Sequence, residues 1–212
     1  MAAFEETLAS AGRRLGEVLR RAGVDASFGP GPVAELRDVA RELAFSAELR
    51  DLYATAGPVH RVHIPAPLGG ITLTPGRELA AYQSGYRTNG NDGRRQAGWP
   101  DSWVVVADHS ADPFIADTGT PGTPVGIAMH GSGSWRPYWV ARTPTDFLGL
   151  LACFTQAYVV EYLNGPDDDA GASADADADE IRPPAYHDRL AALLHASEPG
   201  VDVAAFLDYL SQ

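Results

Sequence analysis

The chain has 212 residues, of which 45% are hydrophobic and 21% are charged, and its single cysteine is Cys153. This composition excludes collagen-like and wholly disordered chains, and one cysteine excludes a framework of internal disulfides and favours a reducing compartment. The formal net charge is -12, from 28 acids and 16 bases that are all arginine, so a basic partner is favoured over nucleic acid or an anionic membrane.

The N-terminal residues do not resemble a secretory signal. Glu5 and Glu6 stand where such a signal places basic residues, and no stretch approaches the ~20 consecutive apolar residues of a membrane span. We therefore expect a soluble cytoplasmic protein that binds neither membrane nor nucleic acid.

Three amphipathic patterns predict helices in the first part of the chain. The first has apolar residues at three- and four-residue steps between residues 4 and 22, and it should end near Gly23. Two more helices are expected at residues 36–43 and 49–56. The Gly57–Pro58 dipeptide should end the last of them, as glycine and a following proline usually do.

After the third helix the periodicity changes to that of strands. Short strands are predicted at residues 59–64 and 71–73, separated by a connection that contains Pro65. A short helix is expected near residues 77–82. The polar stretch at residues 84–101 is expected to be a long loop, and loops of this length often carry function.

Four further strands are predicted in close succession, at residues 103–107, 113–116, 124–130 and 135–141. The gaps between them are too short for crossover helices, so neighbouring strands should run antiparallel. The predicted fold is therefore α+β, with an antiparallel-rich sheet of about six strands that is flanked by helices. Extra helices are expected at both ends of the chain.

A strong capping sequence predicts the next helix. Thr143 suits the N-cap and Pro144 the first helical position, and the carboxylate of Asp146 would face the positive end of the helix dipole. The apolar stripe of this helix continues to Tyr162 and is wide enough to cover one face of a sheet.

Composition divides the remainder of the chain. Residues 165–180 contain seven acids, no base and no aromatic or branched aliphatic residue, so an acidic disordered linker is predicted there. Residues 181–212 carry two short helical patterns that Pro199 and Gly200 separate. These helices dock either on the main domain or on a partner, and the sequence leaves both alternatives open.

The sequence thus predicts four parts. They are an N-terminal helical extension at residues 1–31, an α+β domain at residues 32–164, the acidic linker at residues 165–180 and a C-terminal helical appendage at residues 181–212.

The calcium-binding pattern in the sequence is incomplete. Asp175, Asp177 and Asp179 match the first three ligands of a calcium-binding loop, but Glu180 and Tyr186 replace the glycine and the glutamate that such a loop needs. We therefore interpret this stretch as part of the linker.

Two histidine pairs and the cysteine also lack the partners that a site would need. His60 and His63 would lie on opposite faces of a strand, and His187 and His195 have no further ligand beside them, so all four are expected to be surface residues. Cys153 lies in an apolar run and is expected in the core. We predict no metal, no cofactor and no catalytic residue.

Three carboxylates and a histidine follow one predicted hairpin, at Asp108, His109, Asp112 and Asp117. Their chemistry suits a metal or acid–base site, and an undetected metal-dependent hydrolase built on Asp108, His109 and Asp117 is one hypothesis. We favour a turn, because local bonds from Asp108 and Asp112 to the backbone explain the spacing without a ligand.

Four tryptophans fall between residues 99 and 139. Trp103 and Trp139 are expected to pack in the sheet. Trp99 follows the polar loop and Trp135 adjoins a glycine-rich tip, where an aromatic residue either anchors a partner or packs in the core.

This order of elements resembles the SUKH superfamily, which takes in fungal regulators of cell-wall synthesis and many bacterial immunity proteins of polymorphic toxin systems. Three features carry the resemblance: a helix that ends at Gly57, the hairpin WVVVAD followed by DPFIAD at residues 103–117, and the closing strands and helix at residues 124–151. The resemblance covers residues 35–160, so the domain at residues 32–164 should be SUKH-like. In the hairpin turn, Ala111 stands where the family usually has glycine.

The resemblance implies binding without catalysis. Bacterial members of the family inhibit toxins that are often nucleases or deaminases, and such enzymes tend to have basic clefts that an acidic inhibitor complements. We therefore predict an immunity protein, with a regulatory adaptor as the alternative. The expected contact surface comprises the loop at residues 84–101 and the residues Trp99, Asp108, Asp112, Asp117, Trp135 and Arg136.

Overall fold

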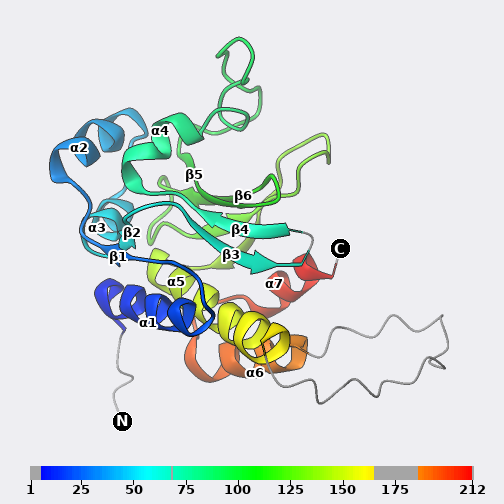
Figure 1. Ribbon diagram of the computed structural model, residues 1–212. Helices are drawn as coiled ribbons and strands as arrows, with labels where there is room; N and C mark the ends of the chain where they lie inside the picture. Colours follow the sequence, from blue (N-terminus) through cyan, green and yellow to red (C-terminus); the bar gives the residue numbers. More distant parts are fainter. Residues whose placement is uncertain (1–5, 68, 165–185, 212) are drawn as a thin grey trace.

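A computed structural model of the protein describes residues 6–67, 69–164 and 186–211, and it confirms the predicted α+β fold. The acidic linker and the calcium-like pattern predicted at residues 165–180 lie outside these residues. A six-stranded antiparallel sheet occupies the middle of the molecule (Figure 1). Its strands follow one another in chain order: β3 Val62–Ala66, β4 Gly69–Leu73, β5 Trp103–His109, β6 Asp112–Asp117, β7 Val125–Ile127 and β8 Tyr138–Ala141.

The helices lie at the positions where the sequence patterns place them. They are α1 Leu8–Arg21, α2 Val33–Glu42, α3 Ala47–Thr55, the 3-10 turn η1 Gly76–Glu78, α4 Leu79–Tyr82, α5 Pro144–Phe154, its π-helical continuation η2 Thr155–Leu163, α6 Tyr186–Ser197 and α7 Val203–Leu210. The predicted cap of α5 is confirmed, because the Thr143 hydroxyl accepts a hydrogen bond from the Asp146 backbone N–H at 3.1 Å.

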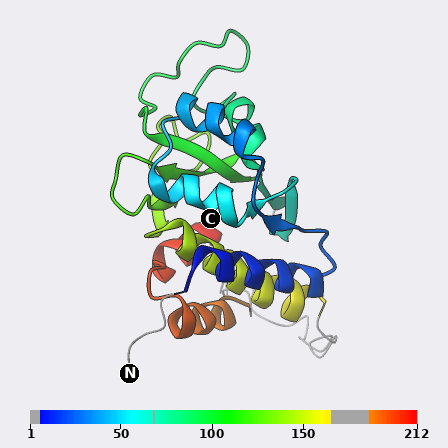
Figure 2. The ribbon, with the colours of Figure 1, turned by 90° about the vertical axis from the view of Figure 1, so that its left-hand side faces the viewer.

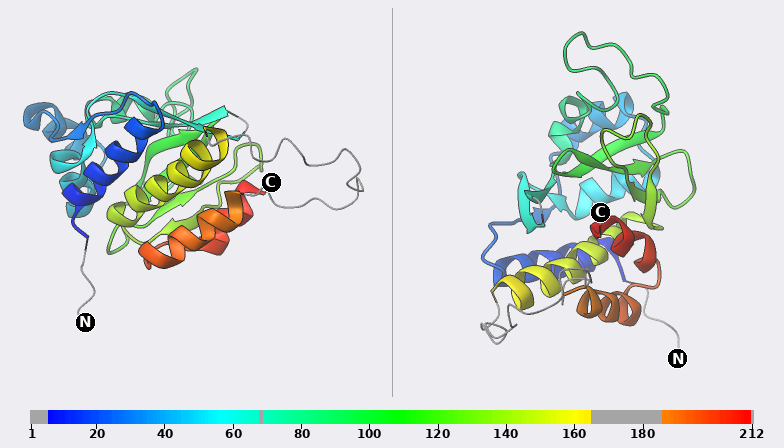
Figure 3. Two further views of the ribbon diagram at one scale, coloured as in Figure 1. Left: turned by 60° about the horizontal axis from the view of Figure 1, so that its bottom comes forward. Right: turned by 90° about the vertical axis from the view of Figure 1, so that its right-hand side faces the viewer.

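One face of the sheet is covered by a layer of helices. Helix α5 with η2 crosses the sheet, with α1 along one flank and α6 along the other (Figure 3). These helices and α7 share one hydrophobic core with the sheet, to which α1 contributes Leu15, α6 Leu190 and α7 Phe206, all fully buried. The described parts of the predicted N-terminal extension and C-terminal appendage therefore complete the main core.

The C-terminal segment also continues the sheet. Ala141 on β8 forms an isolated antiparallel bridge with Val201, between α6 and α7. The Arg142 backbone N–H donates to the Gly200 carbonyl at 3.0 Å, and the Asp202 N–H donates to the Val140 carbonyl at 2.9 Å. The sequence left two possibilities for the C-terminal helices, docking on the main domain or on a partner. These contacts show that they dock on the main domain.

The central strands are buried on both faces. Val104 and Phe114 point into the large core beneath the helices, whereas Val105 and Ile115, one residue further along each strand, belong to a second, smaller core. Figure 2 shows the helical layer at one end of the molecule and the loop at residues 84–101 at the opposite end. Both faces of β5 and β6 are therefore covered, one by the helical layer and the other mainly by the loop, with Tyr82 of the short helix α4.

Helices α2 and α3 form a separate hairpin beside the sheet. The chain enters and leaves this hairpin through a two-stranded sheet in which β1, Phe28–Gly29, pairs with β2, Gly57–Pro58. The dipeptide predicted to end the third helix does so and also forms β2. The Gly31 N–H donates to the Tyr53 carbonyl at 3.0 Å, which closes the base of the hairpin.

Several strand boundaries differ from the predictions. The first strand begins at Val62 and includes Pro65, which was expected to separate two strands. Proline is tolerated there because β3 is an edge strand, whose outward N–H positions need no partner. The strands predicted at residues 124–130 and 135–141 are confined to β7 and β8, since the glycine-rich tip between them does not pair.

The hairpin between β5 and β6 turns through two residues with left-handed backbone. Ser110 has φ of 52° and Ala111 has φ of 80°, while His109 and Asp112 pair across the turn. A two-residue turn with both central residues at positive φ suits the twist of antiparallel strands but favours glycine or asparagine. Ala111 therefore holds a strained conformation at the position where the resembled family usually has glycine.

Replacing Ala111 with glycine should relieve this strain. We expect Ala111→Gly to raise the free energy of unfolding by about 0.5–1 kcal/mol, because glycine adopts positive φ without the clash of a Cβ atom. Ala192→Gly, on the exposed side of α6, should instead lower it by about 1 kcal/mol. Urea denaturation of both variants measures the difference, and a loss of stability in Ala111→Gly would contradict the strained turn.

Candidate functional site

The carboxylate of Asp108 accepts hydrogen bonds from the hairpin turn and from helix α4. Its Oδ1 accepts a hydrogen bond from the Ala111 backbone N–H at 3.3 Å, and its Oδ2 accepts one from the Tyr82 hydroxyl. Burial raises the pKa of Asp108, while the bond from Ala111 and the nearby basic side chains oppose this shift. The side chain therefore stabilises the turn, as the turn interpretation predicts.

The carboxylate of Asp112 joins three segments. Its Oδ1 accepts the His130 backbone N–H at 2.7 Å and lies 2.6 Å from the His130 Nδ1, and its Oδ2 accepts the Tyr209 hydroxyl at 3.1 Å. The strand β6, the segment after β7 and the last helix are thus tied together by one side chain. The local turn bond predicted for Asp112 is therefore replaced by these long-range contacts, and the turn prediction is correct for Asp108 alone.

Asp117 shapes a turn at the opposite end of β6. Its Oδ1 accepts the Gly119 backbone N–H at 3.0 Å and its Oδ2 accepts the Thr120 hydroxyl at 2.8 Å. Each of the three acids predicted to contact a partner therefore accepts hydrogen bonds from the chain itself, and the structure does not gather them into one patch.

His109 is buried, with 7% of its surface exposed, and both of its ring nitrogens are engaged. Nε2 lies 2.7 Å from the Pro67 carbonyl oxygen, which can only accept, so Nε2 carries a hydrogen atom. Nδ1 lies 2.6 Å from the Tyr209 hydroxyl. In the described part of the chain, no three histidine, cysteine, aspartate or glutamate side chains lie in an arrangement that holds a metal ion.

The predicted aromatic anchors form the second core. Trp99 lies edge-on to Trp103 at 5.6 Å and to Trp135 at 5.4 Å between ring centroids, and Tyr86 lies 6.0 Å from Trp135. Trp99 is only 5% exposed, and its indole N–H donates to the Trp103 carbonyl at 3.2 Å. Of the two alternatives left open for Trp99, packing in the core is confirmed.

The other two tryptophans differ from each other. Trp103 packs in the aromatic cluster, as predicted. Trp139 lies in β8, but 38% of its surface is exposed, so the prediction that it packs within the sheet is only partly correct. Trp139 lies on an outer strand of the sheet, whereas Trp103 lies on a strand with neighbours on both sides.

The loop at residues 84–101 is fastened to the sheet by Gln83, a residue that sequence reasoning did not single out. The Gln83 side chain donates to the carbonyls of Leu79, at 2.9 Å, and Val105, at 3.0 Å, and it accepts the Val105 N–H at 2.9 Å. Its amide therefore holds α4, the start of the loop and β5 together beneath the aromatic cluster.

Because Trp99 is buried, its contribution is best measured as a change in the free energy of unfolding. We expect Trp99→Ala to lower the free energy of unfolding by about 3–5 kcal/mol, because a buried ring leaves a large cavity. Trp139→Ala should lower the free energy of unfolding by less than half as much, since the Trp139 side chain is partly exposed to water. Equilibrium unfolding in guanidinium compares the two, and similar small losses for both would show that Trp99 is not a core residue.

The hairpin tip beyond β7 carries the remaining predicted contact residue. Arg136 is exposed and lines a pocket of about 340 Å³ with Met129, Ser132, Ser134 and Tyr138. Trp135, at its side, is half-buried against the aromatic cluster. Arg136 and part of Trp135 therefore remain available at the surface.

A larger pocket, of about 640 Å³, lies where the start of α1, helix α3, the start of α5 and the turn at residues 197–200 meet. We call it the acidic pocket. One guanidinium, that of Arg142, lines it together with the carboxylates of Glu6, Glu48, Asp51, Asp146 and Glu198. Sequence reasoning missed this pocket, because its acids come from four separate segments that no motif connects.

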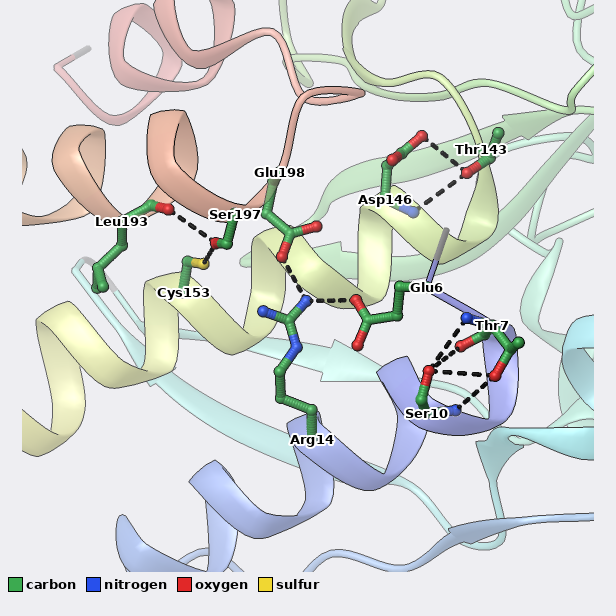
Figure 4. A network of polar contacts seen from close by, with 10 residues as sticks. All are labelled: Glu6, Thr7, Ser10, Arg14, Thr143, Asp146, Cys153, Leu193, Ser197 and Glu198. Carbon is green, nitrogen blue, oxygen red and sulfur yellow. Dashed lines mark hydrogen bonds and ion pairs between the residues drawn. The ribbon is translucent and has the colours of Figure 1, made fainter. Parts of the chain in front are cut away.

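An ion-pair network forms one wall of the acidic pocket (Figure 4). The Arg14 guanidinium donates from Nη2 to Glu6 Oε2 at 2.8 Å and to Glu198 Oε1. Glu198 is 4% exposed, and burial raises the pKa of its carboxyl group. Although burial also disfavours a charged guanidinium, the bond and attraction to Glu198 hold the pKa of Arg14 above its ordinary value.

Two glycines make room for these carboxylates. A Cβ atom at Gly149, on α5, would overlap the Glu198 carboxylate and crowd the Arg14 guanidinium. A Cβ atom at Gly200 would overlap the carboxylate of Asp146. Gly149 inside an otherwise apolar helix is the one local signal in the sequence that a polar group packs against this face.

Cys153 and His187 are both buried. Cys153 is buried, as expected, and its Sγ lies 3.5 Å from the Ser197 hydroxyl (Figure 4). The prediction that His187 is a surface residue is wrong: it is 4% exposed on α6, because this face of α6 packs into the core, and burial lowers its pKa. His63 and His195 are exposed, as expected.

A double-mutant cycle tests the Arg14–Glu198 pair. We expect Arg14→Met to lower the free energy of unfolding by about 3 kcal/mol, because it leaves the buried Glu198 without its cation. Adding Glu198→Met to Arg14→Met should recover part of this loss. The free-energy change of the double variant should therefore differ from the sum of the two single changes by at least about 1 kcal/mol, as measured by urea denaturation. Arg41→Met, which breaks an exposed pair with Asp38, should cost under about 0.5 kcal/mol. Purely additive losses at Arg14 and Glu198 would contradict the coupling.

No protein-family model, curated protein or solved structure matches the chain. Among the helices of the described ranges, none is both long enough and apolar enough to cross a membrane.

Proposed function

We propose that this protein is a non-catalytic binding protein that recognises a basic protein domain, and that it acts in the cytoplasm as an immunity protein against a cognate toxin. The observation that carries the proposal is the acidic pocket, whose lining contains five carboxylates and the Arg142 guanidinium. Two of the five, Glu6 and Glu198, are paired with Arg14, which does not line the pocket, so Glu48, Asp51 and Asp146 carry its excess negative charge. The resemblance to the SUKH superfamily supports the immunity role, and it suggests a nuclease or a deaminase as the target.

The charge of the acidic pocket is suited to an encounter with a basic surface. Asp51 is exposed on α3, and the pKa of Glu48 is lowered by a bond to its own backbone, against a smaller effect of burial. The lowered pKa keeps the Glu48 carboxyl group ionised at neutral pH. Complementary charge of this kind raises the association rate and selects among partners.

The acidic pocket replaces the contact surface expected from the sequence as the centre of the proposed interface. Asp108 and Asp117 lie at opposite ends of the β5–β6 hairpin, whereas the acids of the pocket line one concavity. Among the pocket acids, Asp51 accepts no hydrogen bond from the described residues through its side chain, which leaves its charge available.

The immunity role is tested by the protein encoded beside this one. Expression of that neighbour should arrest growth, and co-expression of this protein should restore growth and yield a stable complex. A neighbour that is harmless, or a complex with an unrelated housekeeping assembly, would overturn the immunity role in favour of the adaptor alternative.

Charge reversal locates the interface. We expect Asp51→Arg to raise the Kd for the toxin domain at least tenfold, about 1.4 kcal/mol, mainly through a slower association rate at low salt. Glu17→Arg makes the same charge change on an exposed residue of α1 that does not line the pocket, and it should change the Kd less than threefold. Surface plasmon resonance at two salt concentrations measures both, and equal effects would place the interface elsewhere.

A further inference from the structure

A further hollow lies beside helix α3 and shares one lining residue, Asp51, with the acidic pocket. It is a groove of about 280 Å³ between α2 and α3, lined by Val33, Leu36, Arg37, Ala40, Phe45, Arg50, Asp51, Tyr53 and Ala54. We call it the α2–α3 groove. Its volume is at the lower limit of ligand pockets, about 300 Å³, so it fits one or two large side chains and is too small for a cofactor.

The floor of the α2–α3 groove is apolar. Leu36, Phe45 and Tyr53 form its base, and the rings of Phe45 and Tyr53 lie 5.9 Å apart between centroids. Val33, at one end, is 70% exposed, the largest fraction for any large hydrophobic residue in the described part of the chain. An apolar floor that continues into an exposed valine is typical of a surface that another chain covers.

The rim of the same groove is positive. Arg37 on α2 and Arg50 on α3 both line it, opposed only by Asp51. Arg37 is exposed and forms no ion pair within the described ranges. Arg50 donates one hydrogen bond, from Nη2 to the Phe45 carbonyl at 2.9 Å, and retains its other donors. Two guanidiniums at an apolar groove are unusual on a chain whose net charge is -12.

These features define the chemistry of an occupant. The apolar floor calls for a bulky apolar side chain, and the arginines call for a carboxylate beside it, because guanidinium and carboxylate form paired hydrogen bonds. Val33 and Arg37 are four residues apart and share one face of α2. An acidic and an apolar residue on neighbouring turns of a bound helix would meet both.

The acidic segment of this chain itself does not fit. Residues 165–180 offer carboxylates but no aromatic or branched aliphatic side chain that would fill the floor. We propose that the α2–α3 groove binds a short segment of a partner protein that inserts a leucine-like or phenylalanine-like side chain between the helices and places a carboxylate beside Arg37 and Arg50. This partner differs in charge from the basic domain of the proposed function, and the inference does not depend on that function.

The experiment selects ligands without assuming a partner. A phage-displayed library of random twelve-residue peptides is panned on the full chain and, in parallel, on Val33→Asp, whose side chain is exposed enough for the fold to tolerate the change. We expect the wild-type selection to enrich peptides with a bulky apolar residue within four positions of an acid, and the Val33→Asp selection to lose them.

The strongest selected peptide is then synthesised with a fluorescent label and titrated by anisotropy. We expect Val33→Asp and Arg37→Glu each to raise its Kd at least tenfold. Arg41→Glu, which makes the same charge change on α2 outside the groove, should raise it less than threefold. Thermal unfolding and circular dichroism of the three variants confirm that each is folded.

Three outcomes would overturn the proposal. The first is the absence of any apolar and acidic peptide enriched on the wild-type chain over Val33→Asp. The second is a selected peptide whose Kd is the same for Arg37→Glu and Arg41→Glu. The third is light scattering that shows a wild-type dimer and a monomeric Val33→Asp, because a second copy of this chain would then occupy the groove. Toxin binding that survives Val33→Asp leaves the proposed function intact.

Discussion

Helix α5 is buried on every side after its first turn, and the arrangement of the whole molecule follows from this constraint. Pro144 and all eight residues from Phe147 to Phe154 are buried, and a helix of that composition needs cover on all faces. The sheet covers only one of them. Helix α1 from one end of the chain and α6 from the other cover the flanks, so segments that lie outside the resembled family core are required for the main core.

The sequence predicts those elements whose signals are local. The cap at Thr143, the stop at Gly57 and the break at Pro199 and Gly200 depend on neighbouring residues, and the structure confirms each. The continuous apolar run at residues 103–107 predicts a strand equally well. It does not reveal what covers the second face, because the cover over Val105 comes mainly from a loop and not from a long amphipathic helix.

The candidate site is the part that the sequence predicts least. Glu6, Glu48, Asp146 and Glu198 become neighbours only when four segments pack together, and none has a motif of its own. The acids that do share a segment have separate roles: Asp108 bonds to the backbone of the hairpin turn, whereas the Asp112 carboxylate bonds to His130 and Tyr209. Spacing along the chain therefore predicts the role of Asp108 but not the long-range contacts of Asp112.

The Arg14–Glu198 pair joins residues 184 positions apart, and this has a consequence for synthesis on the ribosome. While α6 is still unmade, the emerging chain has one uncovered flank of α5 and an arginine with no glutamate at position 198. Closing such distant contacts is slow compared with forming local helices. The nascent protein therefore passes through a stage in which its core is open to proteases and chaperones, and the last two helices end that stage.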